Sequence, residues 1–238
     1  MNAKSIFTFC MLAIALVIGV ISAQGLGSHA QAKPFQDGTN VEATPAADVL
    51  SDSTIQTQEK KLETATFGAG CFWCVEAVFQ KLKGVRSVES GYMGGHTLDP
   101  TYKQICTGTT GHAEIIKIEF DPAVITFKEL LEVFWKTHDP TTLNRQGNDT
   151  GTQYRSAVFY NNDTQKELAE KYKAKLNESG AFRAPIVTEV TAATKYYPAE
   201  KYHQNYWNTQ GQESGYCQAV IPPKLKKLKA AFADKLKE

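Results

Sequence analysis

The 238-residue sequence predicts an α/β chain of the α+β kind: a two-layer sandwich with a ferredoxin-like mixed sheet, flanking helices and a long C-terminal coil. Short runs alternate between apolar and polar residues, and the segments between them carry apolar residues at helical spacing. The resulting order is β-α-β-β-α-β-α-β-α. Its split β-α-β units with neighbouring antiparallel strands favour a two-layer sandwich over a doubly wound parallel sheet.

Strands are expected over residues 63–67, 85–92, 113–120, 155–160 and 186–192. The run 113–120 alternates most clearly, with Ile116, Ile118 and Phe120 on one face. A long polar loop is expected over 139–153, because that stretch lacks periodicity.

Helices are expected over residues 71–82, from Thr126 onward, over 164–177 and over the tyrosine-rich stretch 199–208. Thr126 is a typical N-cap residue, and the helix after it has an apolar face of Leu130, Leu131, Phe134 and Trp135. The lysine-rich tail 224–237 reads as a short amphipathic helix, with Leu225, Leu228 and Phe232 on one side.

The composition is that of a soluble globular protein, with 42% hydrophobic and 21% charged residues. A formal net charge of +1 argues against a nucleic-acid-binding surface spread over the protein. We interpret the basic tail as a solvated helix packed by its apolar face, rather than as a membrane or nucleic-acid contact. We therefore expect a monomer without nucleic-acid partners or stable membrane contact.

The N-terminus reads as a signal peptide covering residues 1–32. Lys4 precedes an apolar run over 6–21, and Ala30-Gln31-Ala32 fits an A-x-A cleavage site. We expect export to the periplasm or secretion; the alternative is a membrane anchor formed by an uncleaved leader, although the run is short for a full span. Residues 33–60 read as a flexible linker. The folded domain is expected over 61–217, followed by a basic amphipathic extension over 218–238.

A reactive cysteine is predicted where the first strand meets the first helix, in Gly70-Cys71-Phe72-Trp73-Cys74. The partial positive charge of a helix N-terminus is expected to stabilise a Cys71 thiolate, beside an apolar wall formed by Phe72 and Trp73. Four cysteines remain after leader removal: Cys71, Cys74, Cys106 and Cys217. The C-x-x-C spacing of the first two indicates redox chemistry rather than structural stapling.

A cysteine nucleophile needs a proton source, and Glu114 is the candidate. It aligns with the apolar face of the run 113–120, where desolvation would raise its pKa and keep it protonated. Tyr102, Asp149 and Tyr154 lie in polar loops, and tyrosine hydroxyls bind oxygens that gain negative charge. His112, His138 and His203 lack the paired spacing of a zinc site; they read as structural, and no metal site is expected.

Four motifs together resemble the A-type peptide methionine sulfoxide reductases. They are Gly70-Cys71-Phe72-Trp73, Gly108-Thr109-Thr110-Gly111-His112-Ala113-Glu114, Gly147-Asn148-Asp149-Thr150-Gly151-Thr152-Gln153-Tyr154-Arg155-Ser156 and Gly215-Tyr216-Cys217. The similarity runs from about residue 63 to residue 217, and it makes 61–217 the catalytic domain.

The resemblance implies a role for each candidate residue. Cys71 attacks the sulfur of methionine S-sulfoxide, in proteins or free, and Glu114 protonates the departing oxygen. The oxygen is positioned by Tyr102, Asp149 and Tyr154. The S-methyl group is enclosed by Phe72 and Trp73. The products are methionine and a sulfenic acid on Cys71.

A second thiol must then resolve the sulfenic acid, and the resemblance assigns this role to Cys217. Cys74 departs from the commonest family pattern, which has glycine there, but it lies one helical turn from Cys71 and is within disulfide reach in principle. Three routes are possible: Cys217 attacks the sulfenic acid directly, Cys74 attacks it directly, or a disulfide formed by one pair of cysteines is passed to another pair. We expect both to be redox-active. No bound cofactor is implied, a thioredoxin-like protein is the expected reductant, and Cys106 is interpreted as structural or spare.

Two other interpretations compete with this one. A thioredoxin-like dithiol oxidoreductase would use Cys71 and Cys74, with Ala184-Pro185-Ile186 as its proline loop. It leaves Glu114 and the stretch 148–154 unexplained. A disulfide-stapled binding module would show no substrate-dependent loss of thiols.

Overall fold

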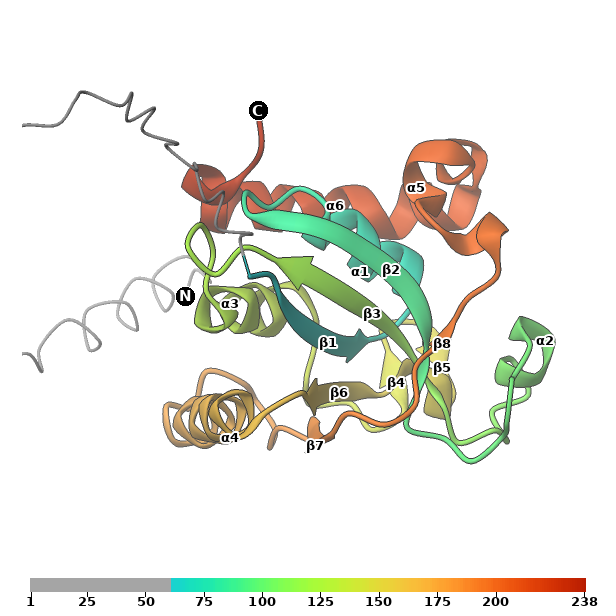
Figure 1. Cartoon of the computed structure of the whole chain (residues 1–238), viewed down its shortest axis with the longest axis horizontal. Helices are drawn as coiled ribbons and strands as arrows, with labels where there is room; N and C mark the ends of the chain where they lie inside the picture. Colours follow the sequence, from blue (N-terminus) through green and yellow to red (C-terminus); the bar gives the residue numbers. More distant parts are fainter. Residues whose placement is uncertain (1–60) are drawn as a thin grey trace, which may run out of the picture. The chain divides into compact units, whose positions relative to one another are not determined.

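The central sheet has six strands in the order β7-β6-β1-β3-β2-β8 (Figure 1). β1 pairs antiparallel with both β3 and β6, β3 pairs antiparallel with β2, and β6 pairs in parallel with β7. Two split β-α-β units follow, because β1 and β2 flank β3 while β3 and β6 flank β1. The strands are β1 (Glu63–Ala69), β2 (Val85–Met93), β3 (Ala113–Phe120), β6 (Ser156–Tyr160), β7 (Glu189–Ala192) and β8 (Tyr197–Pro198). The predicted mixed sheet is confirmed.

The computed structural model describes residues 61–238. The predicted signal peptide (1–32) and linker (33–60) lie outside the described residues. The α-helices are α1 (Phe72–Phe79), α2 (Tyr102–Ile105), α3 (Phe127–Thr137), α4 (Asp163–Glu178), α5 (Tyr206–Thr209) and α6 (Gly215–Phe232). α6 packs against both α1 and α3 (Figure 1), and Lys224 of α6 donates a hydrogen bond to the carbonyl of Thr137 at the end of α3 (2.9 Å).

The main core lies between one face of the sheet and the helices. Ile116, Ile118 and Phe120 of β3 are fully buried there, as their alternation predicts. Phe67 of β1 packs on Phe134 of α3, with ring centroids 5.0 Å apart. Because successive strand residues point to opposite faces, Glu114 joins this buried face two residues before Ile116.

Side-chain caps fix where the helices start. Thr126 accepts a hydrogen bond from the N–H of Glu129, and Glu129 reaches back to Thr126, so the predicted cap is a complete capping box. The Asn162 side chain accepts the N–H of Gln165 at the start of α4, and the Ser214 side chain accepts the N–H of Cys217 at the start of α6. Ser214 thereby sets the start of the helix that carries Cys217.

Two sequence predictions differ from the structure in the C-terminal part. The helix predicted over 199–208 is wrong: the chain forms a 3₁₀ turn (Lys201–His203) and the short α5. Asn205 takes a left-handed φ of 53° that breaks the helical path. The predicted long C-terminal coil is interrupted by short elements, because residues 193–214 contain β8, two 3₁₀ turns and α5, and α6 begins at Gly215. The helix expected over 224–237 forms the second half of α6 up to Phe232, and a 3₁₀ turn (Ala233–Lys235) follows it.

The polar loop predicted over 139–153 also carries regular structure. It contains a small hairpin of β4 (Arg145–Gln146) and β5 (Asp149–Thr150), followed by a 3₁₀ turn, η1 (Thr152–Tyr154). This hairpin was missed because two-residue strands show no periodicity. It carries Asp149 and leads to Tyr154.

Candidate active site

Cys71 is the N-cap residue of α1, and only Gly70 separates it from the end of β1 at Ala69. The turn needs glycine at position 70, where φ is +87° and a Cβ atom would lie 2.6 Å from the side chain of Gln146. The carbonyl of Cys71 accepts hydrogen bonds from the N–H groups of Cys74 (3.1 Å) and Val75 (3.3 Å), which start the helix. The predicted strand–glycine–cysteine–helix arrangement is confirmed, and Cys71 is 7% exposed.

Burial acts against the thiolate that the sequence predicts for Cys71. It raises the pKa of Cys71 well above its ordinary value, and the neighbouring Cys74 thiol adds to the effect. The nearby Tyr216 hydroxyl lowers this pKa, but the net direction is upward. The thiolate expected from the helix N-terminus therefore stays a prediction.

Glu114 of β3 lies directly at the start of α1. Its Oε2 accepts a hydrogen bond from the backbone N–H of Phe72 at 3.0 Å, and the residue is 2% exposed. Burial raises the pKa of Glu114 well above its ordinary range, the nearby Cys71 raises it further, and the Phe72 N–H opposes the rise. A buried carboxyl that keeps its proton beside a nucleophile has the properties of a general acid.

The polar candidates Tyr102, Asp149 and Tyr154 come from three elements and lie near enough to this carboxyl to interact with its charge. Burial raises the pKa of Tyr102, and Glu114 is the next cause of the rise. Burial and Glu114 raise the pKa of Tyr154 in the same way, followed by Cys71 and Asp149. The structure therefore brings the predicted polar residues around Glu114. The tyrosines keep their hydroxyl protons and can donate to a substrate oxygen.

Phe72 and Trp73 open α1 and form an aromatic wall beside Cys71. The Phe72 ring is buried and lies 5.9 Å from the ring of Tyr92 and 6.3 Å from that of Tyr102. The Trp73 indole is half-buried and stacks on Tyr206, with centroids 4.0 Å apart and planes 13° apart. The site thus has apolar surface on one side and hydroxyl donors on the other.

Three of the described cysteines share one buried cluster. Cys71, Cys74 and Cys217 pack with Ala77, Trp207 and Ile221. All are free thiols. Cys106, by contrast, is exposed. Its pKa is raised by partial burial, and a hydrogen bond with Tyr102 only partly opposes the rise. Both predicted partner thiols are therefore beside Cys71.

Sequence reasoning missed three residues of this site: Tyr216, Tyr206 and His203. The Tyr216 hydroxyl donates to Oδ2 of Asp149 at 2.5 Å and lies close enough to Cys71 for each group to shift the pKa of the other. The sequence does carry a signal for Tyr216, which directly precedes Cys217 in the motif Gly215-Tyr216-Cys217. Tyr206 and His203 carry no such signal, because the stretch that holds them is predicted as one regular helix.

The described residues hold no group of three or more His, Cys, Asp or Glu side chains arranged for a metal ion. Among the helices of residues 61–238, none combines the length and apolar character needed to cross a membrane.

Comparison with known proteins agrees with this geometry. The family model for peptide methionine sulfoxide reductase matches residues 63–236, and so extends past Cys217 into the C-terminal helix. The peptide methionine sulfoxide reductase MsrA of Chromobacterium violaceum is 54% identical over 172 residues, which is 72% of this chain and 97% of that protein. The MsrA of Natronomonas pharaonis is 53% identical over 173 residues, covering 73% and 97%.

Solved structures give the same result. Mxr1 of Saccharomyces cerevisiae in its reduced form has a TM-score of 0.61 at 33% identity, covering 67% of this chain and 92% of that one. Methionine sulfoxide reductase A of Corynebacterium diphtheriae has a TM-score of 0.57 at 40% identity, covering 65% and 77%. The chain belongs to the peptide methionine sulfoxide reductase family, as a member of its A type.

Proposed function

We propose that Cys71 attacks the sulfur of methionine (S)-sulfoxide while Glu114 delivers its proton to the sulfoxide oxygen. The attack forms a bond between the two sulfurs, and the protonated oxygen leaves the substrate sulfur as its S–O bond breaks. Transfer of that oxygen to the Cys71 sulfur then breaks the sulfur–sulfur bond, leaving methionine and a cysteine sulfenic acid. The observation that carries the proposal is the hydrogen bond from Phe72 N–H to Glu114 (3.0 Å), since it holds a protonated carboxyl at the helix end that bears the thiol. Reduction of methionine (S)-sulfoxide is the activity of the family to which the chain belongs.

The two sides of the site match the two sides of a methyl sulfoxide. Hydroxyl donors at Tyr102 and Tyr154, with Asp149 nearby, would bind the oxygen as it gains negative charge. The rings of Phe72 and Trp73 would enclose the methyl group. Such a site recognises only the sulfoxide end of the side chain, which supports both protein-bound and free methionine sulfoxide as substrates.

A thiol relay would return the enzyme to its starting state. The thiol of Cys74 or Cys217 attacks the Cys71 sulfenic acid, a disulfide forms and water leaves. The burial of all three sulfurs in one cluster supports both partners. A thioredoxin-like dithiol protein would then reduce the disulfide by exchange, so that no bound cofactor takes part. We also keep the expectation that the chain acts as a monomer.

Export remains part of this proposal. Its support is the apolar run over 6–21 followed by Ala30-Gln31-Ala32. N-terminal sequencing of the protein recovered from outside the cytoplasm should begin at Lys33. A start at Met1 in the membrane fraction would instead support the uncleaved anchor.

The proposed reaction is tested by supplying the purified enzyme with a mixture of the two methionine sulfoxide epimers and a thioredoxin system. The S epimer should be converted to methionine with one dithiol oxidised for each sulfoxide consumed. Consumption of the R epimer alone, or oxidation of dithiol without methionine formation, would overturn the proposal.

A further inference from the structure

We infer that His203 is a positioning residue for this reaction: its imidazole fixes the edge of the Trp73 indole and thereby sets the size of the pocket for the S-alkyl group. The inference rests on the proposed function, because it takes Trp73 as a wall of that pocket. It concerns a residue that the sequence alone marked as structural.

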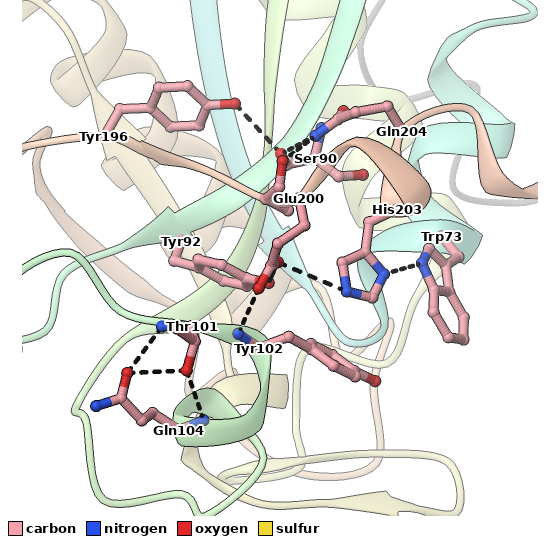
Figure 2. A network of polar contacts seen from close by, with 11 residues as sticks. Trp73, Ser90, Tyr92, Thr101, Tyr102, Gln104, Tyr196, Glu200, His203 and Gln204 are labelled. Atoms are coloured by element: carbon pink, nitrogen blue, oxygen red, sulfur yellow. Dashed lines mark hydrogen bonds and ion pairs between the residues drawn. The ribbon is translucent and has the colours of Figure 1, made fainter.

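The central contact joins two segments that are 130 residues apart in the chain. The indole Nε1–H of Trp73 donates to Nδ1 of His203 at 3.1 Å (Figure 2). The face of the same indole stacks on Tyr206, 4.0 Å between centroids. An indole stacked only on its face can still turn in its plane, whereas the bond to His203 removes that freedom.

His203 itself is firmly enclosed. It is 1% exposed, and three aromatic rings surround it: Tyr202 at 4.1 Å, Tyr102 at 4.3 Å and Phe72 at 5.1 Å between centroids. Phe72 and Tyr102 also belong to the proposed site. The imidazole therefore packs directly against Phe72, one of the two rings proposed to enclose the methyl group.

The hydrogen bond fixes the tautomer of the imidazole. Since Nδ1 accepts from Trp73, the proton of the neutral ring sits on Nε2. Nε2 makes no hydrogen bond among the described residues, and it faces Oε2 of Glu200 at 3.7 Å. That carboxylate attracts the Nε2 proton without reaching hydrogen-bond distance. Burial lowers the pKa of His203, and Glu200 only partly opposes this, so the lone pair on Nδ1 stays free for Trp73.

Glu200 is held in place by groups outside its own segment. The Tyr92 hydroxyl donates to its Oε2 at 2.9 Å, and the backbone N–H of Tyr102 donates to its Oε1 at 2.9 Å (Figure 2). Burial raises the pKa of Glu200, but these donors outweigh it and keep the carboxylate ionised. One carboxylate thus links the histidine to the first residue of α2.

The backbone on both sides of His203 is fastened as well. The Gln204 amide bonds to the N–H and carbonyl of Ser90 in β2, each at 2.9 Å (Figure 2). The buried Glu76 carboxylate accepts the N–H groups of Asn205 (2.9 Å) and Tyr206 (3.3 Å). This strap, residues 200–206, is therefore fixed to β2, α1 and α2, and it presents His203 and Tyr206 to Trp73 from a rigid base.

A fixed indole predicts discrimination by alkyl size. With the indole held, the pocket accepts S-methyl; once released, the indole can move aside and admit S-ethyl. Loss of the hydrogen bond should therefore reduce the rate with the methyl substrate more than with the ethyl one. A general loss of structure would lower both rates alike.

The test compares His203→Phe with His203→Asn in the full-length enzyme, using the S-sulfoxides of methionine and ethionine. Phe keeps a ring but has no acceptor, while the Asn amide oxygen can replace Nδ1. H203F should lower kcat/KM for methionine sulfoxide by about tenfold, as expected for one buried hydrogen bond. The methyl-to-ethyl ratio should fall with it, and H203N should recover most of both. The 15N shift of the Trp73 indole N–H, assigned with Trp73→Phe, should move in H203F and return in H203N.

A double-mutant cycle completes the test. In the Trp73→Phe background, H203F should lower kcat/KM little further, because the indole N–H that donates to His203 is already absent. Tyr202→Phe keeps the ring on the other side of His203 and serves as the matched control with unchanged selectivity. Equal losses for both substrates, or additive effects in the cycle, would overturn the inference. A wild-type enzyme that reduces neither substrate would instead overturn the proposed function.

Discussion

Glu114 on β3 and Phe72 on α1 are joined by a hydrogen bond of 3.0 Å, from the backbone N–H of Phe72 to the carboxyl oxygen Oε2. The bond ties the proposed acid to the helix end that carries the proposed nucleophile. The Phe72 N–H belongs to the first helical turn, and it donates to this carboxyl rather than to the Cys71 sulfur. The distance between acid and thiol is thus set by the sheet and the helix rather than by a loop.

Glu114→Gln should keep this bond and remove the acid. The amide oxygen can still accept from Phe72, but it has no proton to give to the sulfoxide. We expect kcat to fall by about 10²–10⁴, the range of general acid catalysis. Stopped-flow measurement of methionine formation in the first turnover checks this. Glu119→Gln is the matched control, since it lies on the same strand and its carboxylate accepts from Ser87. Equal rates in E114Q and the wild type would exclude Glu114 as the acid.

The wild-type rate should also fall at high pH for the same reason. Because burial raises the pKa of Glu114, its protonated form persists above the usual range for a carboxyl and is lost as pH rises through that raised pKa. In the wild type, the single-turnover rate constant plotted against pH should therefore have a limb that descends toward high pH. A profile of the same shape in E114Q would assign the limb to another group.

The hydroxyls of Tyr102 and Tyr154 should each contribute about one hydrogen bond to the transition state. Tyr102→Phe and Tyr154→Phe are each expected to lower kcat/KM by about tenfold, and the double variant by more than either. Tyr172→Phe removes a hydroxyl that donates to Glu132, on α4 and α3, and serves as the control. If both tyrosine variants matched this control, oxygen binding would have to come from other donors, with Tyr216 the first to examine.

The packing of the three buried thiols predicts redundancy in the relay. Cys74→Ser and Cys217→Ser should each still convert the sulfenic acid to a disulfide, because the other thiol also lies in the cluster. The double variant should stop after one methionine and keep a sulfenic acid that dimedone labels. Cys106→Ser, which changes an exposed thiol, should cycle normally. Continued turnover with thioredoxin in the double variant would show that neither cysteine is needed.

Glu76 should make stability depend on pH. Burial raises its pKa to about 7, against the opposing N–H groups of Asn205 and Tyr206. The native state then holds a proton that the unfolded chain releases near pH 4, so the free energy of unfolding falls as pH rises from about 4 to about 7. Each unit of that pKa difference is worth about 1.4 kcal/mol. Glu76→Gln should flatten this slope in urea unfolding curves at pH 5 and pH 8. Parallel slopes in both proteins would contradict it.

Local patterns predicted the parts of the fold that depend on local chemistry. The strand over 113–120 has the predicted boundaries, because its alternation directly reflects one buried face. The Thr126 cap was readable because capping involves residues three apart. Glu114 could be placed on the buried face by the same counting, and its raised pKa follows from that face.

The strap over 200–206 could not be predicted in this way. Its path depends on Glu76, Ser90 and Tyr102, which lie about 100 or more residues away in the chain. Taken by themselves, the residues of the strap predict a helix. The raised pKa of Cys71 could not be predicted for a related reason: the helix N-terminus is visible in the sequence, but the burial of the thiol in a cluster with Trp207 and Cys217 is not. Long-range contacts of this kind decide both cases.

The central claim is that the Cys71 sulfur takes the oxygen. Its most direct test is one turnover with (S)-methionine sulfoxide and no reductant, followed by alkylation of free thiols and mass spectrometry of the disulfides. We predict one methionine per enzyme and a disulfide that joins Cys71 to Cys74 or Cys217, or joins Cys74 to Cys217 after exchange, with none formed in Cys71→Ser. Methionine produced by Cys71→Ser at the wild-type rate, or a Cys71 still alkylated after turnover with all other thiols free, would contradict the account.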